Sequence, residues 1–343
     1  MAAKITVAIL GYGFMGSTHA DAWRLIDGCV VKGVWARDNS KTSKFASERG
    51  IKAYSSFSDV LDDKEVDVVD ICTPTYTHAE YAIQALKSGK HVIVEKPMAL
   101  SLADADKMIH AADESGMKLM VAHVLRFFPE YMKVKELVDE GKLGEICQAR
   151  AFRGGAFPEW SPWFGEVEKS GGVAVDTAIH DVDYITWISS GIPQRVYAKI
   201  RRGAKEASAK YEIAFINVRY KNGMIAFIEA SWAHPPSFPF TMKLELDGTE
   251  GTVTLDNQSP VPISLFSRTI RQGYAPESLP WKPMVHPFPL DPFYRELSHF
   301  VDCVRNDKTP MTDGRASRRS LELCLASVKS AETGRPVELP FVG

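Results

Sequence analysis

The stretch Ile5–Trp23, ITVAILGYGFMGSTHADAW, decides the fold. A short apolar run typical of a buried strand leads into Gly11, Gly13 and Gly16, and a helical pattern follows. In this context the first glycine permits a tight turn, the second lets a pyrophosphate approach the backbone, and the third allows close packing of the helix, whose N-terminus faces the phosphates. A glycine-rich connection without a ligand is the alternative. The residues predicted to bind a dinucleotide here are Gly11, Gly13, Phe14, Met15 and Gly16.

The end of the second predicted strand bears on the choice of cofactor. A carboxylate about 20 residues after the loop would hold the ribose diol of NAD. This chain has Ala36 there, followed by Arg37, and Asp38 is expected to turn away. Arg37, with Lys41 or Lys44 nearby, suits a 2'-phosphate. We therefore predict NADP in preference to NAD; the alternative is that Arg37 stacks on adenine and that both cofactors bind.

Outward from this loop, strand-like and helical patterns alternate as far as about residue 123, which predicts parallel strands joined by crossover helices. In the last of these helices Ser101 and Asp104 form a capping pair and Gly116 is the stop. The strands are predicted at 5–10, 30–35, 66–73, 91–95 and 119–123, and the helices at 17–26, 40–49, 76–89 and 101–116.

The pattern changes after residue 124 to longer strands with alternating apolar residues, which predicts a mostly antiparallel sheet. Helical patterns at 173–189, 292–305 and 315–331 are expected to cover one face of it. We predict an α/β protein: a Rossmann dinucleotide-binding domain over 1–123, and an α+β domain with a large, open, mostly antiparallel sheet over 124–343, which binds substrate and forms oligomers. The strands are predicted at 146–152, 196–200, 213–220, 225–232, 241–246 and 252–255.

Length, net charge and cysteine content limit the kinds of partner that the protein is expected to bind. A chain of 343 residues suits about two domains, and a net charge of -2 provides no overall attraction to nucleic acid or anionic membrane. No apolar segment reaches the length of a membrane span, and the first residues lack a basic leader and cleavage site. The five cysteines are scattered, so neither a disulfide framework nor a metal site is predicted. We expect a cytoplasmic protein with a small-molecule partner.

Lys96 is the first candidate catalytic residue. It follows the apolar run Val92–Val94 at the carboxyl edge of the parallel sheet, where ligands of open α/β sheets bind. Pro97 biases it towards an extended backbone. A solvated lysine at a strand end is the alternative.

Asp176 and His180 are the second candidates. They are four residues apart in a predicted helix after Gly171 and Gly172, so that they would share one face. A carboxylate beside an imidazole fixes its orientation, and histidine titrates near physiological pH, which suits acid–base work on an alcohol. A surface ion pair is the alternative.

These motifs together resemble the glucose-fructose oxidoreductase/inositol dehydrogenase family, and the resemblance spans nearly the whole chain. It rests on the glycine loop, CTPTYTH (72–78), GKHVIVEKP (89–97), LRFFPEY (125–131), GGVAVDTAIHDVDYITWI (171–188) and SAETGRPVEL (330–339). The Glu-Lys-Pro and Asp-x-x-x-His elements are its most specific parts. Ala36 departs from the acid common in members that use NAD.

The resemblance implies roles for residues of this chain. The family's catalytic lysine, aspartate and histidine fall on Lys96, Asp176 and His180. Cofactor contacts are implied at Thr73, Pro74 and His78, with Glu95 and Lys96 beside them. The family also implies a homodimer or homotetramer formed through the open sheet.

Three further residues are predicted to contact substrate: Arg126, Trp163 and His234. Aromatic faces pack well on the C–H surfaces of sugars, although scaffolding or core packing is an equal alternative for each. His19 is expected to have a packing or surface role.

The sequence thus predicts an NAD(P)-dependent dehydrogenase or reductase that moves hydride between nicotinamide and a secondary alcohol or ketone of a sugar, cyclitol or related polyol. One rival is a glycosidase or epimerase that oxidises its substrate transiently. Another is a nucleotide-sensing protein without turnover.

Overall fold

The computed structural model describes residues 4–202, 210–267, 271–274 and 288–342. The chain forms two compact units, each described by itself: Met1–Val124 with Pro287–Arg318, and Leu125–His286 with Arg319–Gly343. In the described ranges no helix is both long enough and apolar enough to cross a bilayer.

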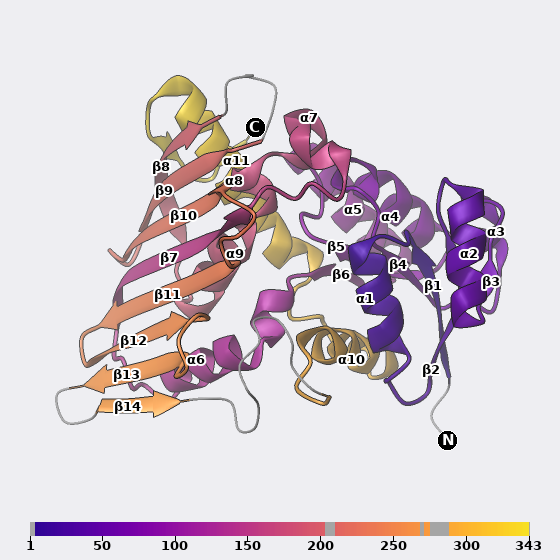
Figure 1. The fold of residues 1–343 in the computed structure, drawn as a ribbon, viewed down its shortest axis with the longest axis horizontal. Helices are drawn as coiled ribbons and strands as arrows, with labels where there is room; N and C mark the ends of the chain where they lie inside the picture. The colour runs from indigo at the N-terminus through magenta and orange to yellow at the C-terminus, as the bar shows by residue number, and fades with distance from the viewer. Residues whose placement is uncertain (1–3, 203–209, 268–270, 275–287, 343) are drawn as a thin grey trace. The chain divides into compact units, whose positions relative to one another are not determined.

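The first unit is built on a six-stranded sheet in which every pair of neighbouring strands is parallel (Figure 1). The order β3-β2-β1-β4-β5-β6 is that of a doubly wound dinucleotide-binding sheet, as predicted. All four residues of β4 are buried, as expected for a strand covered on both faces. The strands are β1 (Ile5–Leu10), β2 (Cys29–Trp35), β3 (Lys52–Ala53), β4 (Val68–Ile71), β5 (His91–Glu95) and β6 (Leu119–Ala122).

The helices of this unit begin and end at local signals. In α5 the Ser101 side chain accepts a hydrogen bond from the Asp104 N–H at 3.1 Å, and Gly116 ends the helix in the left-handed conformation, which confirms both predicted ends. The helices are α1 (Phe14–Trp23), α2 (Asn39–Arg49), α3 (Phe57–Asp62), α4 (His78–Lys87), α5 (Leu102–Ser115) and α10 (Pro292–Arg305), with a 3₁₀ turn η1 (Thr75–Thr77).

Helix α10 has the predicted bounds but not the predicted domain. Its buried residues include Phe293, Glu296 and Phe300, and it packs against α1. The sequence placed it in a continuous second domain over 124–343, whereas the segment Pro287–Arg318 groups with the first unit. The start of the second unit at Leu125 agrees with the predicted change near residue 124.

The second unit contains a nine-stranded sheet with the order β14-β13-β12-β11-β7-β10-β9-β8-β15. Only β7 and β10 pair in parallel, which confirms a mostly antiparallel open sheet. The strands are β7 (Ile146–Ala156), β8 (Pro193–Arg201), β9 (Ile213–Tyr220), β10 (Ile225–His234), β11 (Thr241–Gly248), β12 (Gly251–Asp256), β13 (Ile263–Ser267), β14 (Arg271–Tyr274) and β15 (Val337–Glu338).

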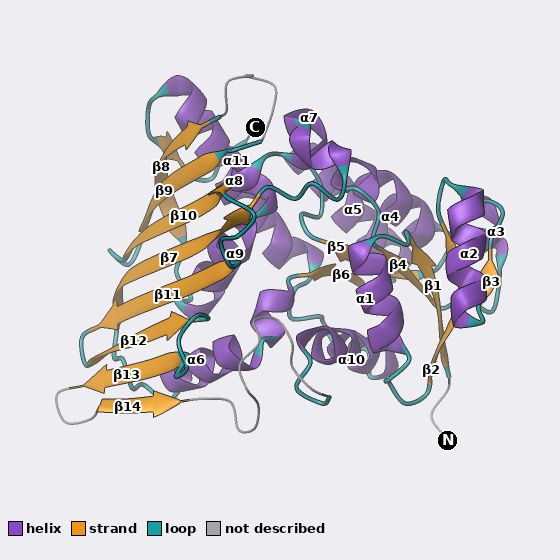
Figure 2. Cartoon of the chain, viewed as in Figure 1, coloured by secondary structure: helices purple, strands orange, loops and turns teal. Residues whose placement is uncertain are grey.

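Helices lie on one face of this sheet, as α6 and α9 illustrate in Figure 2. In β9 buried residues alternate with exposed ones, among them Phe215, so the other face meets solvent within this unit. We call that face the outer face. The helical segments are η2 (Val124–Phe127), α6 (Pro129–Asp139), η3 (Pro162–Gly165), α7 (Val167–Ser170), α8 (Val173–Asp176), α9 (Ile179–Ile188) and α11 (Gly314–Thr333), which begins in the first unit.

The prediction of one continuous helix over 173–189 is wrong. The chain forms α8 and α9, and the hydrogen bonds between them depart from α-helical spacing: the Ala178 N–H reaches back five residues to the Val173 carbonyl, at 2.9 Å, and the His180 N–H reaches back three, to the Thr177 carbonyl, at 3.4 Å. The four-residue spacing of Asp176 and His180 is therefore not that of a regular helix.

Candidate active site

The three glycines of the loop between β1 and α1 have different surroundings. A Cβ atom on Gly11, whose φ is +102°, would lie 2.6 Å from the Cys72 carbonyl oxygen, and one on Gly16 would lie 2.3 Å from the Gly11 carbonyl oxygen. A Cβ atom on Gly13 would have nothing within 4 Å. Gly11 and Gly16 are thus required by packing, while Gly13 leaves open space beside its backbone, as a pyrophosphate would need.

The start of α1 suits an anion. Gly13 is its N-cap, no side chain caps it, and its first turn contains no acidic residue. The first turn of any helix presents N–H groups without intrahelical acceptors and carries a partial positive charge. The backbone of Phe14, Met15 and Gly16 therefore fits the phosphates of a dinucleotide.

At the end of β2, Asp38 is turned away from the predicted cofactor region. Its side chain caps α2 by accepting the Lys41 N–H at 3.1 Å. Arg37 is exposed and donates to the Tyr76 hydroxyl at 2.9 Å, with its guanidinium carbon 5.9 Å from the centre of the Tyr76 ring. The sequence did not single out Tyr76, which lies in the same CTPTYTH segment as Thr73 and His78.

The loop after β4 is held by hydrogen bonds. His78 is buried, and its Nδ1 and Nε2 atoms lie 2.8 Å from the Pro97 carbonyl oxygen and 2.7 Å from the Thr73 carbonyl oxygen. Burial lowers the pKa of His78 despite these two carbonyls. Both ring nitrogens face carbonyl oxygens, and a neutral imidazole donates to one of them, so His78 shapes the loop; its contact with cofactor remains a prediction. Thr73 and Pro74 are partly exposed there.

Lys96 follows β5 at the carboxyl edge of the parallel sheet and is partly exposed. Its main-chain N–H donates to the Glu95 carboxylate at 3.1 Å, and the bond to Pro97 is cis. The Glu95 side chain is buried. The position of Lys96 at this edge is as predicted, whereas Glu95 faces the interior and its predicted contact with cofactor is not supported.

In the second unit, Asp176 ends α8 and is buried, and His180 is partly buried in the first turn of α9. The paired glycines before them have positive φ values, +79° for Gly171 and +71° for Gly172. Glu212 accepts the Val173 N–H at 2.5 Å at the start of α8. The turn before Asp176 is therefore stabilised by Glu212, which lies 39 residues after Val173 in the sequence. Nothing in the sequence pattern indicated this role of Glu212.

Arg126 lies in a buried ion pair. Its Nε and Nη2 atoms donate to the two carboxylate oxygens of Asp183 at 2.7 and 2.8 Å, and its guanidinium stacks near Trp187. This bidentate pairing is a scaffold contact, so the geometry does not support the predicted role of Arg126 in substrate binding.

Trp163 and His234 belong to two different aromatic groups. Trp163 stacks on Phe164 with ring centres 4.0 Å apart, and Phe164 contacts Trp232. His234 stacks on Phe238 at 4.0 Å and meets the edge of Phe152 at 5.8 Å. Trp163 is partly exposed beside other aromatic rings, which suits a sugar; for both residues contact with substrate remains a prediction.

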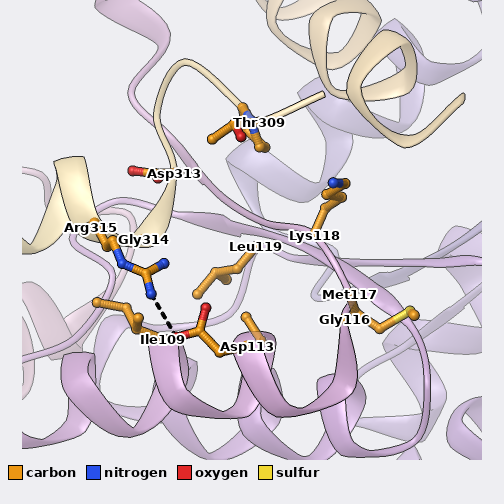
Figure 3. Close-up of a pocket in the computed structure, with 12 residues that line it drawn as sticks. Ile109, Asp113, Gly116, Met117, Lys118, Leu119, Thr309, Asp313, Gly314 and Arg315 are labelled. Atoms are coloured by element: carbon orange, nitrogen blue, oxygen red, sulfur yellow. Dashed lines mark hydrogen bonds and ion pairs between the residues drawn. The ribbon is translucent and has the colours of Figure 1, made fainter. Parts of the chain in front are cut away.

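A cavity in the first unit lies away from these residues (Figure 3). It is lined by α5, by Gly116–Leu119 before and at the start of β6, and by Thr309–Arg315, where Arg315 pairs with Asp113 at 2.7 Å. Because all strands of this sheet run in parallel, the start of β6 is at the opposite edge from Lys96. The cavity is therefore not the predicted cofactor site.

Comparison with known proteins identifies the family of both parts of the chain. The family described as "Oxidoreductase family, NAD-binding Rossmann fold" matches residues 5–123, and the "GFO/IDH/MocA C-terminal domain" matches residues 131–254. The chain is 27% identical to scyllo-inositol 2-dehydrogenase (NAD(+)) of Bacillus subtilis, over 98% of this chain and 96% of that protein. It is 29% identical to D-apiose dehydrogenase of Paraburkholderia graminis, over 97% and 89%.

A solved structure agrees. GenD2 from gentamicin A biosynthesis, in complex with NAD, superposes with a TM-score of 0.87 at 25% identity, covering 99% of this chain and 98% of that one. The matches extend through both units and include the glycine loop, Lys96, Asp176 and His180 within the matched ranges. The chain therefore belongs to the GFO/IDH/MocA family of oxidoreductases, whose first domain is an NAD-binding Rossmann fold.

Proposed function

We propose that this oxidoreductase transfers hydride between the nicotinamide of NAD(P) and a secondary alcohol or ketone carbon of a sugar, cyclitol or related polyol. The observation that carries the proposal is within one sheet: the open space at Gly13 and the partly exposed Lys96 both follow carboxyl ends of parallel strands. Relatives named for inositol and apiose support a polyol substrate.

The cofactor would be held by the first turn of α1 and the loop that contains Thr73 and Pro74, and it supplies or accepts the hydride when bound. Lys96 would donate a hydrogen bond to the reacting oxygen and stabilise negative charge on it. His180 would take the hydroxyl proton in oxidation and return it in reduction, and Asp176 would orient the imidazole. These roles distribute binding, polarisation and proton transfer over separate side chains.

We propose NADP(H) as the preferred nucleotide. Ala36 has no acceptor for a ribose diol, and the exposed Arg37 offers a guanidinium at the same strand end. The hydrogen bond from Arg37 to Tyr76 supports this, because it fixes the cation at the surface where a 2'-phosphate would be expected.

We also propose that the protein is a homodimer or homotetramer through the outer face. Phe215 and Phe227 stack there with ring centres 6.0 Å apart, and Ile225 is 57% exposed. Exposed apolar residues on neighbouring strands are typical of an interface. A reducing compartment such as the cytoplasm fits the five free thiols, all of which lie in the described ranges.

A screen of polyols and their keto forms with NAD and NADP, followed by absorbance of the reduced nicotinamide, tests the proposed activity. Nucleotide that is reduced and released at every turnover supports a dehydrogenase. Reduced nucleotide that stays bound and is reoxidised within each turnover would instead favour transient oxidation, as in a glycosidase or epimerase. Nucleotide binding without turnover of any polyol would favour a sensing protein.

Variants test the roles. General acid–base groups contribute about 10²–10⁴-fold, so His180→Ala should lower kcat by that order and leave nucleotide affinity nearly unchanged. Lys96→Met should affect kcat and substrate binding together, and Asp176→Asn should be milder than loss of His180. His110→Ala, at an exposed position of α5, is the control. A decrease of less than about threefold for His180→Ala would contradict the assignment.

A further inference from the structure

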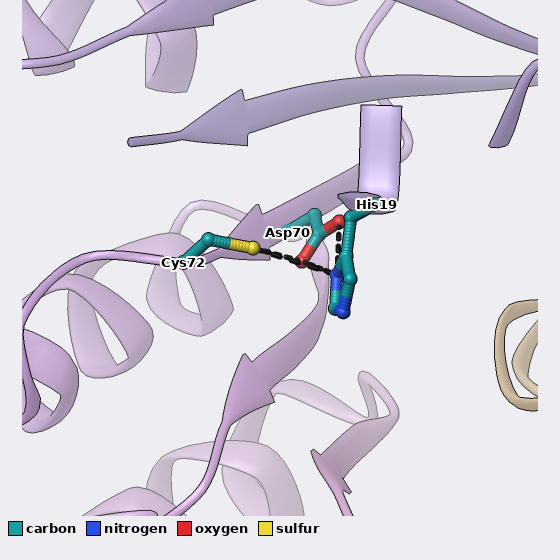
Figure 4. Close-up of side chains that lie close together, drawn as sticks. All are labelled: His19, Asp70 and Cys72. Atoms are coloured by element: carbon teal, nitrogen blue, oxygen red, sulfur yellow. Dashed lines mark hydrogen bonds and ion pairs between the residues drawn. The ribbon is translucent and has the colours of Figure 1, made fainter. Parts of the chain in front are cut away.

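A buried cluster of ionisable side chains lies beneath the glycine loop of the first unit. His19 on α1 is fully buried, and its Nδ1 atom lies 3.0 and 3.1 Å from the two carboxylate oxygens of Asp70 on β4 (Figure 4). Trp23 donates to the same carboxylate at 2.7 Å. The other ring nitrogen of His19, Nε2, lies 3.3 Å from Oε1 of Glu95, the last residue of β5; this is an ion-pair contact that lacks the geometry of a hydrogen bond.

His19 lies between the carboxyl groups of Asp70 and Glu95, and its surroundings shift its pKa. Burial is the largest influence and acts to lower the pKa of His19, but the charges and hydrogen bonds of Asp70 and Cys72 together raise this pKa well above the ordinary value. Glu296, which reaches the cluster from α10, has a pKa that burial raises well above its usual range, and burial also raises the pKa of the Cys72 thiol. These directions favour the protonated form of His19, which faces Asp70 and Glu95, and the neutral forms of Glu296 and Cys72.

Hydrogen bonding explains the close contacts among these groups better than a metal ion does. His19, Asp70 and Cys72 have ligand atoms close enough for one ion. However, the His19 atom in question is the Nδ1 that already meets Asp70, and the thiol lies 3.4 Å from both, as a weak donor to Asp70 and a weak acceptor from His19 would. A thiol with a raised pKa is also a poor source of the thiolate that metals bind.

The cluster leads directly to the backbone of Lys96. While Oε1 of Glu95 faces His19, Oε2 of the same carboxylate accepts the Lys96 N–H at 3.1 Å. On the other side of Lys96, the Pro97 carbonyl oxygen is held by His78 at 2.8 Å. The Lys96 N–H is thus held by Glu95, and the peptide between Pro97 and Met98 is held by His78; the first of these contacts depends on the orientation of Glu95.

We propose that His19 is a positioning residue for the reaction: it holds the Glu95 carboxylate in the orientation that fixes the main chain of Lys96. The inference rests on the proposed function, in which Lys96 contacts the reacting oxygen. His19 itself touches neither substrate nor reacting atoms. A displacement of a catalytic group by about 1 Å can cost as much as 10²-fold in rate, so the holding contact matters more for turnover than for folding.

Two substitutions of His19 separate its two contacts. Glutamine places its amide nitrogen near the former Nε2 and keeps a donor for Glu95, whereas asparagine places its amide nitrogen near the former Nδ1 and keeps only the contact with Asp70. If His19 acts through Glu95, His19→Asn should lower kcat by about tenfold or more, and His19→Gln by much less. Nucleotide affinity should change less than twofold in both.

The matched controls are His110→Asn and His110→Gln, at an exposed helical position of the same unit. These two variants should have the same kcat. A purely structural role of His19 through Asp70 would produce the opposite order, with the asparagine variant retaining more activity. Equal kcat values for the two His19 variants, or losses that follow their melting temperatures, would overturn the proposal.

A second readout needs no turnover. In protein labelled with ¹⁵N-lysine, the Lys96 amide can be assigned by its loss in Lys96→Arg, and its hydrogen exchange can be followed. Exchange should accelerate about tenfold in His19→Asn and remain near the parent value in His19→Gln. If the parent enzyme oxidises no polyol but this difference is present, the proposed function fails and the positioning network stands.

Glu95→Gln covers the case in which the His19 variants do not fold. It keeps an oxygen for the Lys96 N–H but replaces a charge-assisted bond by a neutral one, so Lys96 exchange should accelerate a few-fold. Unchanged exchange of the Lys96 amide in the variants that fold would overturn the proposal, whatever their activity.

Discussion

Alanine substitutions at two glycines of the G-x-G-x-x-G motif, Gly13 and Gly16, should differ in their effect on stability and on nucleotide binding. Gly13→Ala adds a methyl group where nothing lies within 4 Å, at a φ of -67° that alanine adopts readily. Fewer unfolded conformations favour the variant by about 0.4–1 kcal/mol, while alanine is a poorer N-cap by a similar amount. The free energy of unfolding of the nucleotide-free protein should therefore change by less than about 1 kcal/mol.

Gly16→Ala should destabilise the empty protein. The new methyl carbon would lie 2.3 Å from the Gly11 carbonyl oxygen and 2.9 Å from its carbon, so that α1 must move away from the loop. Overpacking of this kind costs about 1–3 kcal/mol, and backbone atoms yield less readily than flexible side chains. Denaturant titration without nucleotide measures this difference, and Gly165→Ala, whose nearest contact would be an ordinary 3.6 Å, is the control.

For nucleotide binding, Gly13→Ala is the variant expected to have the large effect. The methyl of Gly13→Ala would occupy the space where a pyrophosphate is expected, so we expect at least about tenfold weaker binding of NADH and NADPH by calorimetry, or about 1.4 kcal/mol. Parental affinity in Gly13→Ala would refute the placement of the phosphates. Parental stability in Gly16→Ala would refute the packing argument.

Three further outcomes are expected. Ala36→Asp should shift the preference measured by calorimetry from NADP(H) to NAD(H), and a parent protein that binds NAD(H) equally well or better would contradict the argument from this strand end. Phe215→Glu should lower the mass seen by light scattering at micromolar concentration, and a monomeric parent would contradict the interface. The hydrogen bond from Lys32 holds the pKa of the Asp63 carboxyl below its ordinary value, so the stability it adds is present above about pH 4 and is lost as the pH falls. The difference in melting temperature between parent and Asp63→Asn should shrink in acid, and a difference independent of pH would argue against this pair.

The elements that sequence predicts well are those with a strong local pattern. Strands β1, β5 and β9 and helix α10 have the predicted bounds, because their apolar runs or amphipathic faces end at polar or turn residues. Strand β13 and the edge strands β14 and β15 were not predicted, because short strands at or near a sheet edge carry little alternation.

The break between α8 and α9 shows what a periodic pattern cannot provide. Ten of the 17 residues over 173–189 are apolar and occur throughout the segment, so the pattern does not distinguish a continuous helix from two helices joined by a tight turn. Glu212, which caps the start of α8, lies 39 residues away in sequence. Tertiary contacts of this kind decide the geometry around Asp176 and His180.

The type of a residue indicates its chemistry but not the direction in which its side chain points, and this limits what the sequence can predict at the candidate site. The glycine loop was predictable because its function depends on backbone within six residues. His78 and Glu95 lie after or at the carboxyl ends of strands of the parallel sheet, and Arg126 lies in the second unit; the side chains of all three engage protein groups. Spacing along the sequence does not predict which protein group each of these side chains contacts.

A signal for the His19 cluster was nevertheless present in the sequence. Asp70 interrupts the apolar run of β4, and a carboxylate in a strand buried on both faces must have a hydrogen-bonding or ionic partner. The side chains nearest to such a position come from the helix packed on the strand, and α1 offers His19 and Trp23. Buried ion pairs add little to stability compared with apolar residues of similar size. The presence of this cluster beside the backbone of Lys96 is therefore better explained by the placement of that lysine than by folding.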